Sequence, residues 1–181
     1  MKSGRVVAVA RDNAHQFSKD VVGEIQIVVG KGVEGDAHSG ATVKHRSRVA
    51  TDPSQPNLRQ VHLIQSELFS EVSKQGFVVR PGDLGENITT VGIDLMGLPK
   101  GTILRIGRSV ELEVTGLRNP CKQIDDFQKG LLSAVVMRGE NGGRIRKSGI
   151  MTVVKVGGVV RANDVISPIY PQKPYLPLER V

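Results

Sequence analysis

The chain has 181 residues, about the length of one domain, and is 39% hydrophobic and 24% charged. It contains no apolar run of about 18 residues, which excludes a transmembrane helix, and its single cysteine, Cys121, excludes an internal disulfide. The formal net charge of +7 predicts attraction to anions, which could be nucleic acid, a membrane surface or a phosphorylated small molecule.

The aromatic content and the N-terminal residues reduce the number of partner classes that the positive charge leaves open. The chain has no Trp, two Tyr and four Phe, and these form no aromatic stripe beside basic residues, which argues against a nucleic-acid surface. The apolar stretch within residues 1–10 is too short for a signal peptide, and a lone thiol fits a reducing compartment. We therefore expect a cytoplasmic protein that does not bind membranes, with nucleic acid an unfavoured partner.

Short runs rich in β-branched residues recur along the chain and predict strands at 5–10, 24–29, 60–64, 102–106, 110–115 and 150–156. Residues 110–114 alternate apolar and acidic, so one face of that strand is expected in the core and the other in water. Gly107 supplies a turn between this strand and the preceding one, which predicts an antiparallel hairpin.

Helix signals are limited to two short segments. Residues 66–75 begin with Ser66 as a possible N-cap and end at Gly76, and residues 131–138 follow Gly130. Because strands and helices do not alternate regularly, the fold class we predict is mainly β: a closed or nearly closed antiparallel β-barrel with a few short helices. We expect a single domain over residues 1–181, with a core at about 20–166 and a proline-rich, extended tail at 168–181.

The segment around the cysteine, residues 118–122, follows a predicted strand and reads RNPCK. Arg118 and Lys122 flank the thiol, and nearby positive charge favours the thiolate form of Cys121. A thiolate is a good nucleophile and a good ligand for soft metals, so the segment suits sulfur transfer or a bond to a transition metal. The alternative is a buried and inert cysteine.

Three further segments could form a ligand pocket. Residues 32–40 combine three glycines with Asp36 and His38, so bare backbone amides could approach a ligand, although their spacing does not predict a zinc site. The basic run 44–48, which includes Arg46, suits phosphate if it is extended, or forms a solvated edge. The Glu86-Asn87 pair in residues 82–88 could orient a polar ligand, or the loop could cap its own turn.

Taken in order, these motifs resemble the MOSC family, named after the C-terminal domain of molybdenum cofactor sulfurase. The resemblance covers about residues 20–166 and rests on GVEGDAHSG (32–40), KHRSR (44–48), QVHLIQSELFSEV (60–72), GDLGENITT (82–90), LPKGTILRIG (98–107) and RNPC (118–121). It implies a strand-rich barrel and a functional cysteine at Cys121. It also implies that the molybdenum cofactor, a molybdopterin with its metal, is bound by Gly35, Asp36, His38, Arg46, Glu86 and Asn87.

The resemblance implies several functions. In the first, Cys121 carries sulfur as a persulfide, or contacts the molybdenum as a thiolate, while Arg118 and Lys122 stabilise it. The partners would be a pyridoxal-phosphate-dependent cysteine desulfurase and a molybdoenzyme acceptor. The alternatives are a molybdenum-dependent reductase of N-hydroxylated compounds, which needs an electron-donor protein, and a non-catalytic module that binds or stores the cofactor.

Some family members carry a fused pyridoxal phosphate domain. The chain has no counterpart of that domain, so we expect a stand-alone member of the bacterial type and no pyridoxal phosphate bound to this chain. A nucleic-acid-binding module stays open as a further alternative on the strength of the net charge alone.

Overall fold

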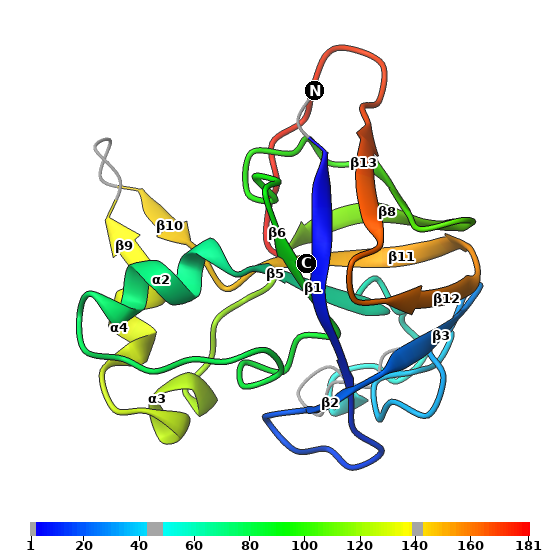
Figure 1. The fold of residues 1–181 in the computed structure, drawn as a ribbon. Helices are drawn as coiled ribbons and strands as arrows, with labels where there is room; N and C mark the ends of the chain where they lie inside the picture. The colour runs from blue at the N-terminus through cyan, green and yellow to red at the C-terminus, as the bar shows by residue number, and fades with distance from the viewer. Residues whose placement is uncertain (1–2, 43–48, 139–142) are drawn as a thin grey trace.

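Seven strands close into a ring in the computed structural model, which describes residues 3–42, 49–138 and 143–181 (Figure 1). In order of pairing they are β13 (Val165–Ile169), β7 (Ile103–Ile106), β8 (Val110–Leu117), β11 (Ile150–Val156), β5 (Val61–Gln65), β6 (Ile88–Val91) and β1 (Gly4–Arg11), which pairs again with β13. The prediction of a mainly β, closed barrel is confirmed. All the pairings are antiparallel except that of β5 with β6.

The parallel pair follows from the connection between its strands. A parallel pair needs a crossover, and here the chain leaves β5 through helix α2 (Glu67–Ser73) and returns through residues 74–87 to enter β6. The returning loop therefore ends next to the start of β5. This brings Glu86 and Asn87 to the same end of the barrel as His62, whose backbone N–H donates to Asn87 Oδ1 over 3.2 Å.

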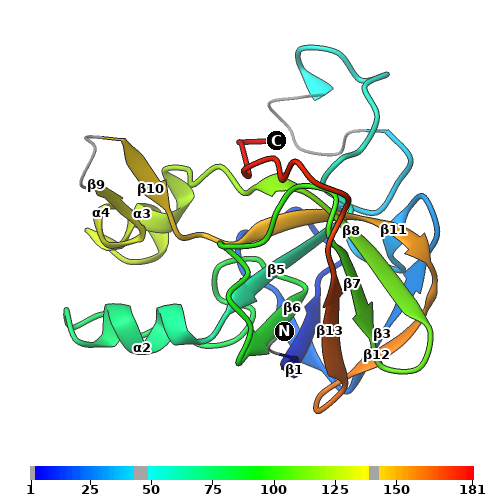
Figure 2. The same ribbon diagram turned by 90° about the horizontal axis from the view of Figure 1, so that it is seen from above.

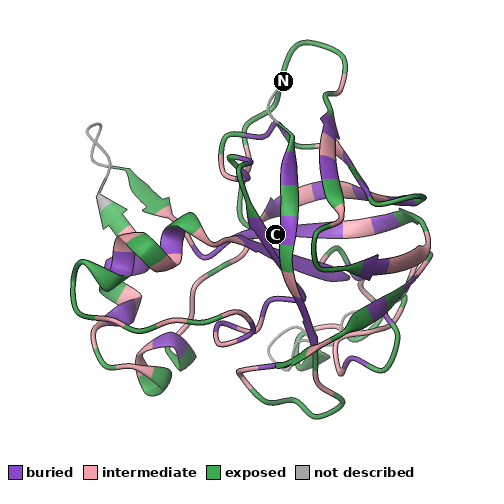
Figure 3. Ribbon diagram, in the orientation of Figure 1, coloured by how far each residue is buried: buried purple, intermediate pink, exposed green. Residues whose placement is uncertain are grey.

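The predicted hairpin is confirmed as β7 and β8, with Ile106 opposite Val110 and Gly107 in the left-handed region at the turn. The alternation also holds, because Val110, Leu112 and Val114 are fully buried while the acidic residues between them are half-buried. The same alternation of buried and open residues marks other ring strands (Figure 3). The barrel interior is thus the main hydrophobic core.

A small second sheet covers one end of the barrel. It consists of β12 (Gly158–Arg161), β3 (Glu24–Val28) and β4 (Gly32–Val33). Just before β3 in the chain, β2 (Asp20–Val22) pairs with β1 of the ring. Ile25, Ile27, Val33 and Val160 of this sheet are buried in the same cluster as the ring residues. Burial of these side chains against the barrel interior closes that end to water.

A helical layer lies on one side of the barrel (Figures 1 and 2). It contains α2, α3 (Gln123–Phe127), α4 (Leu131–Val135) and a two-stranded sheet of β9 (Val136–Arg138) and β10 (Arg144–Arg146). Its separate hydrophobic cluster includes Leu68, Leu84, Ile124, Leu131 and, from β5, Ile64. Strand β5 is therefore shared between the two cores, one on each face.

The helix predictions need one correction. The helix predicted at 66–75 is α2, but the helix predicted at 131–138 ends at Val135, and residues 136–138 form β9 instead. The backbone there pairs with β10, with Val136 opposite Arg146, so tertiary pairing outweighs weak helix propensity. Helix α3 was not predicted. None of the helices in the described part of the chain has the length and apolarity needed to cross a bilayer.

We predict that Leu104→Ala lowers the free energy of unfolding by about 2–5 kcal/mol, because Leu104 is fully buried in the barrel and its loss leaves a cavity. Leu58→Ala, at a side chain that is 46% exposed, should change it by less than about 0.5 kcal/mol. Denaturant titration of both variants measures the difference. Equal effects would contradict the assignment of the barrel interior as the core.

Candidate functional site

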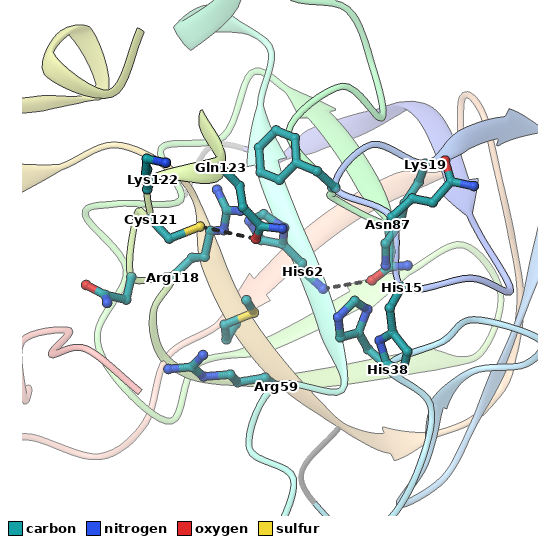
Figure 4. Close-up of a pocket in the computed structure, with 15 residues that line it drawn as sticks. His15, Lys19, His38, Arg59, His62, Asn87, Arg118, Cys121, Lys122 and Gln123 are labelled. Carbon is teal, nitrogen blue, oxygen red and sulfur yellow. Dashed lines mark hydrogen bonds between the residues drawn. The ribbon is translucent and has the colours of Figure 1, made fainter. Parts of the chain in front are cut away.

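A cavity of about 560 Å³ opens where the barrel meets the segment leading into α3. Its walls come from barrel strands β5 and β11, from the loops that precede β2, β5 and β6, and from the segment that follows β8. The side chains that give it chemical character are basic, imidazole, amide or thiol groups, namely His15, Lys19, Arg59, His62, Asn87, Arg118, Cys121 and Lys122, with His38 beside them (Figure 4). No carboxylate is among the described residues that line it.

Cys121 lies at one end of the cavity and is partly exposed. Strand β8 ends at Leu117, and Pro120 precedes the cysteine, which sits just before the first turn of α3. The Cys121 thiol makes a 3.4 Å contact with Gln123 Oε1 (Figure 4). A thiol in this position is reachable from the cavity, unlike the inert, buried cysteine that the sequence left open.

Arg118 lies beside the thiol and is partly buried, with its Nη1 atom cut off from solvent. Its backbone N–H donates to the Gly149 carbonyl over 3.0 Å, and its carbonyl accepts from Ser148 Oγ over 3.2 Å, so the two residues just before β11 hold this segment in place. The guanidinium lies 5.7 Å from the ring centre of Phe17. Burial lowers the pKa of Arg118 from its usual value, while the charges of Cys121 and Glu86 favour its protonated form.

The hydrogen bonding of this guanidinium is incomplete. Among the described residues, Arg118 Nη1 has no partner although it is buried. A buried, unpaired donor on a charged group is costly, and in native structures it usually has a ligand or water to contact. Because Arg118 lines the cavity, the unused donor is available to a molecule bound there.

Glu86 stands in the wall behind the cavity. It is fully buried, and its Oε1 accepts from the Gly82 N–H over 2.7 Å and from Thr89 Oγ1 over 2.9 Å. Burial raises the pKa of this carboxyl above its usual value. Its Oε2 has no partner in the described part of the chain. Glu86 is not among the described residues that line the cavity, but its charge favours the protonated form of Arg118, which does line it.

A second polar cluster lies at the opposite end of the cavity (Figure 4). Lys19 Nζ is 2.6 Å from Asp36 Oδ2, and both side chains are almost completely buried. Asn87 Nδ2 donates to the same oxygen over 3.0 Å, and the His38 backbone N–H donates to Asp36 Oδ1 over 2.9 Å. The cluster joins residues from the loops before β2, after β4 and before β6.

Charge pairing controls ionisation in this cluster. Burial alone would raise the pKa of Asp36, but hydrogen bonds from His38 and the ammonium of Lys19 outweigh it and hold the pKa below its usual value. Burial lowers the pKa of Lys19, and the charge of Asp36 opposes that shift only in part. A buried lysine with a lowered pKa gives up its proton more readily than a surface lysine.

His62 lies on β5 in the floor between the two ends. The His62 side chain is buried, and its Nε2 lies 2.8 Å from the Ser148 carbonyl. Burial, and then the charge of Arg118, lower the pKa of His62 well below its usual value. The imidazole is therefore neutral near pH 7.

The structure brings together most of the residues that the sequence singled out. Arg118, Cys121 and Lys122, together with His38 and Asn87, line the cavity, and Asp36 contacts that lining. Glu86 lies behind the wall. Gly35 is exposed and is not among the described residues that line the cavity; it has a positive φ of 74°, and a Cβ there would lie 2.5 Å from Arg11 Nη1. Arg46 lies outside the described residues.

Among the cavity residues that sequence reasoning missed are His15, Phe17, Lys19 and Arg59. None of these four residues stands in a glycine-rich or basic motif. Only the ring brings their loops next to Cys121, which is more than 60 residues away from the nearest of them.

Comparisons with known proteins agree with this architecture. The MOSC domain family matches residues 38–167. The solved structure of the YuaD protein from Bacillus subtilis superposes with a TM-score of 0.75 at 23% identity, covering 95% of this chain and 99% of that one. YiiM from Geobacillus stearothermophilus gives 0.67 at 17% identity, covering 96% of this chain and 79% of that one.

YiiM from Escherichia coli also matches, with a TM-score of 0.62 at 19% identity, covering 95% of this chain and 73% of that one. Among curated protein sequences, none matches this chain. At these identities the three solved structures establish the shared fold.

We predict that His62 makes the fold less stable in mild acid. Its folded-state pKa lies below the unfolded value of about 6.5, so below pH 6.5 the unfolded chain binds a proton that the native state excludes. The free energy of unfolding should therefore fall by up to about 1.4 kcal/mol per pH unit on this account, and His62→Gln should remove that share.

Denaturant titrations between pH 7 and pH 5 measure this slope. His15→Gln is the matched control, since His15 is exposed and loses little solvent on folding, and it should keep most of the wild-type slope. Identical slopes for wild type and His62→Gln would contradict a buried, neutral His62.

Proposed function

The chain belongs to the MOSC domain family, and we propose that its cavity binds the molybdenum cofactor, with Cys121 as a sulfur carrier or as a thiolate in contact with the metal. The observation that carries the proposal is the partly buried guanidinium of Arg118, whose Nη1 is cut off from solvent and has no partner among the described residues, and which lies close to the thiol. A fixed cation beside a thiol suits a ligand with both an anionic group and a soft metal.

The lining of the cavity fits such a ligand. Arg59 and Arg118 supply positive charge for a phosphate group, and the amide of Asn87 can bind a polar ring. Gly85 also lines the cavity, and its lack of a side chain lets a ligand approach the backbone closely. When bound, the cofactor would supply a molybdenum ion that accepts sulfur ligands, and Cys121 is the residue that would contact it.

In the sulfur-carrier form of the proposal, Cys121 takes sulfur from a pyridoxal-phosphate-dependent cysteine desulfurase. The Cys121 thiolate attacks the outer sulfur of the donor persulfide, the S–S bond of the donor breaks, and the donor cysteine leaves as a thiolate. A new S–S bond makes Cys121 a persulfide, with no net change in oxidation state. A thiolate of the molybdoenzyme acceptor would then attack the outer sulfur of Cys121, the S–S bond at Cys121 would break, and Cys121 would leave as a thiolate while the acceptor carries the persulfide.

The residues around Cys121 support each stage of this exchange. Arg118 is near enough for its charge to interact with that of Cys121, so it stabilises negative charge on the thiolate and on the persulfide. Gln123 Oε1, 3.4 Å from the sulfur, can orient the thiol. Lys122 has an exposed side chain at the cavity rim and adds positive charge where a partner would enter.

The buried Lys19–Asp36 pair favours a second candidate function, the reduction of N-hydroxylated compounds. Conversion of N–OH to N–H with release of water consumes two electrons and two protons. The electrons would come from an electron-donor protein, and Lys19 lines the cavity with a lowered pKa, as a proton donor requires. Asp36 and Asn87 hold Lys19 and its surroundings in position.

We predict that wild-type protein, purified from a host that makes the molybdenum cofactor, retains pterin and molybdenum in about equal amounts. Arg118→Gln should reduce bound pterin by about tenfold or more, because it removes the buried charge. Cys121→Ser should reduce molybdenum more than pterin. Fluorescence of the oxidised pterin and metal analysis measure both.

Lys74→Gln is the matched control for charge, since Lys74 is exposed on the helical layer, and it should retain wild-type amounts. Wild-type protein free of both pterin and molybdenum would overturn cofactor binding. Full retention without sulfur transfer or reduction would instead select the storage module.

Sulfur loading gives a separate test. With a cysteine desulfurase and free cysteine, we predict that wild-type protein gains the mass of one sulfur atom and that Cys121→Ser gains none. Arg118→Gln should load about tenfold more slowly, whereas Lys122→Gln, at an exposed side chain, should slow loading less. Rapid mixing followed by intact-mass analysis gives the rates. Loading of Arg118→Gln at the wild-type rate would exclude the role given to Arg118.

A further inference from the structure

A smaller hollow of about 380 Å³, which we call the side pocket, adjoins the cavity on the side of α3. Its described lining residues are Gln16, Phe17, Ser18, Gln123, Asp126 and Phe127. The first two of these and Gln123 also line the main cavity. Because the Oε1 atom of Gln123 contacts the Cys121 sulfur over 3.4 Å, the side pocket begins beside the thiol (Figure 4).

Two aromatic rings form the apolar walls of the side pocket. The ring centres of Phe17 and Phe127 are 6.1 Å apart, and the rings are tilted by 44°. Phe127 is 37% exposed, and Phe17 is partly buried, with the Arg118 guanidinium 5.7 Å from its ring centre. Aromatic walls with a few polar groups, in a hollow of this size, are typical of small-molecule sites.

The position of Phe127 is fixed although its ring is open to solvent. Within α3, Asp125 Oδ1 accepts from the Leu132 backbone N–H over 2.8 Å. Just after Phe127, Gln128 Oε1 accepts from the Val78 backbone N–H over 3.1 Å. These contacts hold α3 against α4 and against the loop that follows α2, so the Phe127 ring is presented from a rigid frame.

The loop that carries Phe17 is fixed as well. The next residue, Ser18, donates from its Oγ to the Asp83 carbonyl over 2.8 Å. On the same loop, the Phe17 carbonyl lies so close to Gly85 that an added Cβ there would be 2.5 Å from it. Both rings are therefore in place before a ligand arrives, which lowers the entropic cost of binding.

The polar groups of the side pocket favour an uncharged ligand. Asp126 is the one carboxylate among its described lining residues, and its Oδ1 lies 3.4 Å from Lys122 Nζ. The amides of Gln16 and Gln123 are neutral. This lining differs from that of the main cavity, which is basic and contains no carboxylate among the described residues.

We infer that the side pocket is a second ligand site, which binds the flat, uncharged aromatic group of a small molecule whose reactive end reaches Cys121. The two phenylalanine rings supply the contact surface, and Gln123 lies where the side pocket meets the thiol. The inference goes beyond cofactor binding, because it concerns the group that approaches Cys121 from the side of α3.

Thiol–disulfide exchange at the single cysteine measures this preference. The full chain, from a host unable to make molybdopterin, is equilibrated with equal amounts of phenylethanethiol and cyclohexylethanethiol and their disulfides. Both thiols are neutral and have the same carbon skeleton, but only the first has a flat ring. Intact mass gives the phenyl-to-cyclohexyl ratio on Cys121, and the same exchange on N-acetylcysteine gives the reference ratio.

Wild-type protein should exceed the reference ratio by roughly threefold to tenfold, the size expected for a contact between aromatic rings. Phe127→Ala should return the ratio to the reference value, because it removes one wall of the side pocket. Phe127→Tyr should keep most of the enrichment, since the ring stays. Phe127→Leu should lose most of it, since the apolar volume stays but the ring does not.

Tyr170→Ala is the matched control and should keep the wild-type ratio. Tyr170 is 39% exposed and faces the ring of Tyr175 over 5.8 Å, but it is not among the described residues that line either space. A wild-type ratio equal to the reference, or full enrichment in Phe127→Ala, would overturn the aromatic site. Full enrichment in Phe127→Leu would overturn the aromatic class of the ligand.

Discussion

The partial burial of one arginine, with one of its donors cut off from solvent, is the constraint around which the site at the open end of the barrel is arranged. Removing a guanidinium from water costs several kcal/mol unless its donors and its charge are satisfied. Glu86 and Cys121 compensate the charge of Arg118, and Phe17 covers one face, but one nitrogen stays unpartnered among the described residues. This unpaired donor lies at the cavity, where a bound ligand could supply the missing hydrogen-bond acceptor.

The barrel topology determines which groups surround this arginine. The ring closes through β1 and β13, and its single parallel pair brings the loop before β6 next to β5. Loops from four distant parts of the chain then meet at one end, with the thiol on one side and the Lys19–Asp36 pair on the other. A rigid ring that presents chemistry on its loops is a common way to position a site.

Much of the fold could be predicted from local patterns. The alternation in residues 110–114 and the turn at Gly107 specify a hairpin by themselves, since one face must be buried. Residues 136–138 were misassigned because strand β9 exists only through its pairing with β10, a contact that local propensity does not contain. The parallel pair was missed for the same reason.

The site residues likewise fall into two groups: those that the local sequence predicts and those that depend on tertiary contacts. Cys121 and Arg118 could be predicted because they lie in one short segment, residues 118–122, and because the family resemblance points to them. Lys19 and Arg59 could not, since each is a cation of ordinary context until the ring closes and, for Arg59, until the tail reaches it. The burial of Glu86 behind the wall, rather than in the cavity, likewise depends on the loop that follows α2.

The central claim is that Arg118 is buried for a ligand and not for the fold. The most direct test is the free energy of unfolding of Arg118→Met in ligand-free protein. If the claim holds, the variant is as stable as wild type or more stable, because an incompletely paired buried cation has been replaced by an apolar group of similar length. A loss of about 3–5 kcal/mol, as expected for breaking a structural buried ion pair, would contradict it.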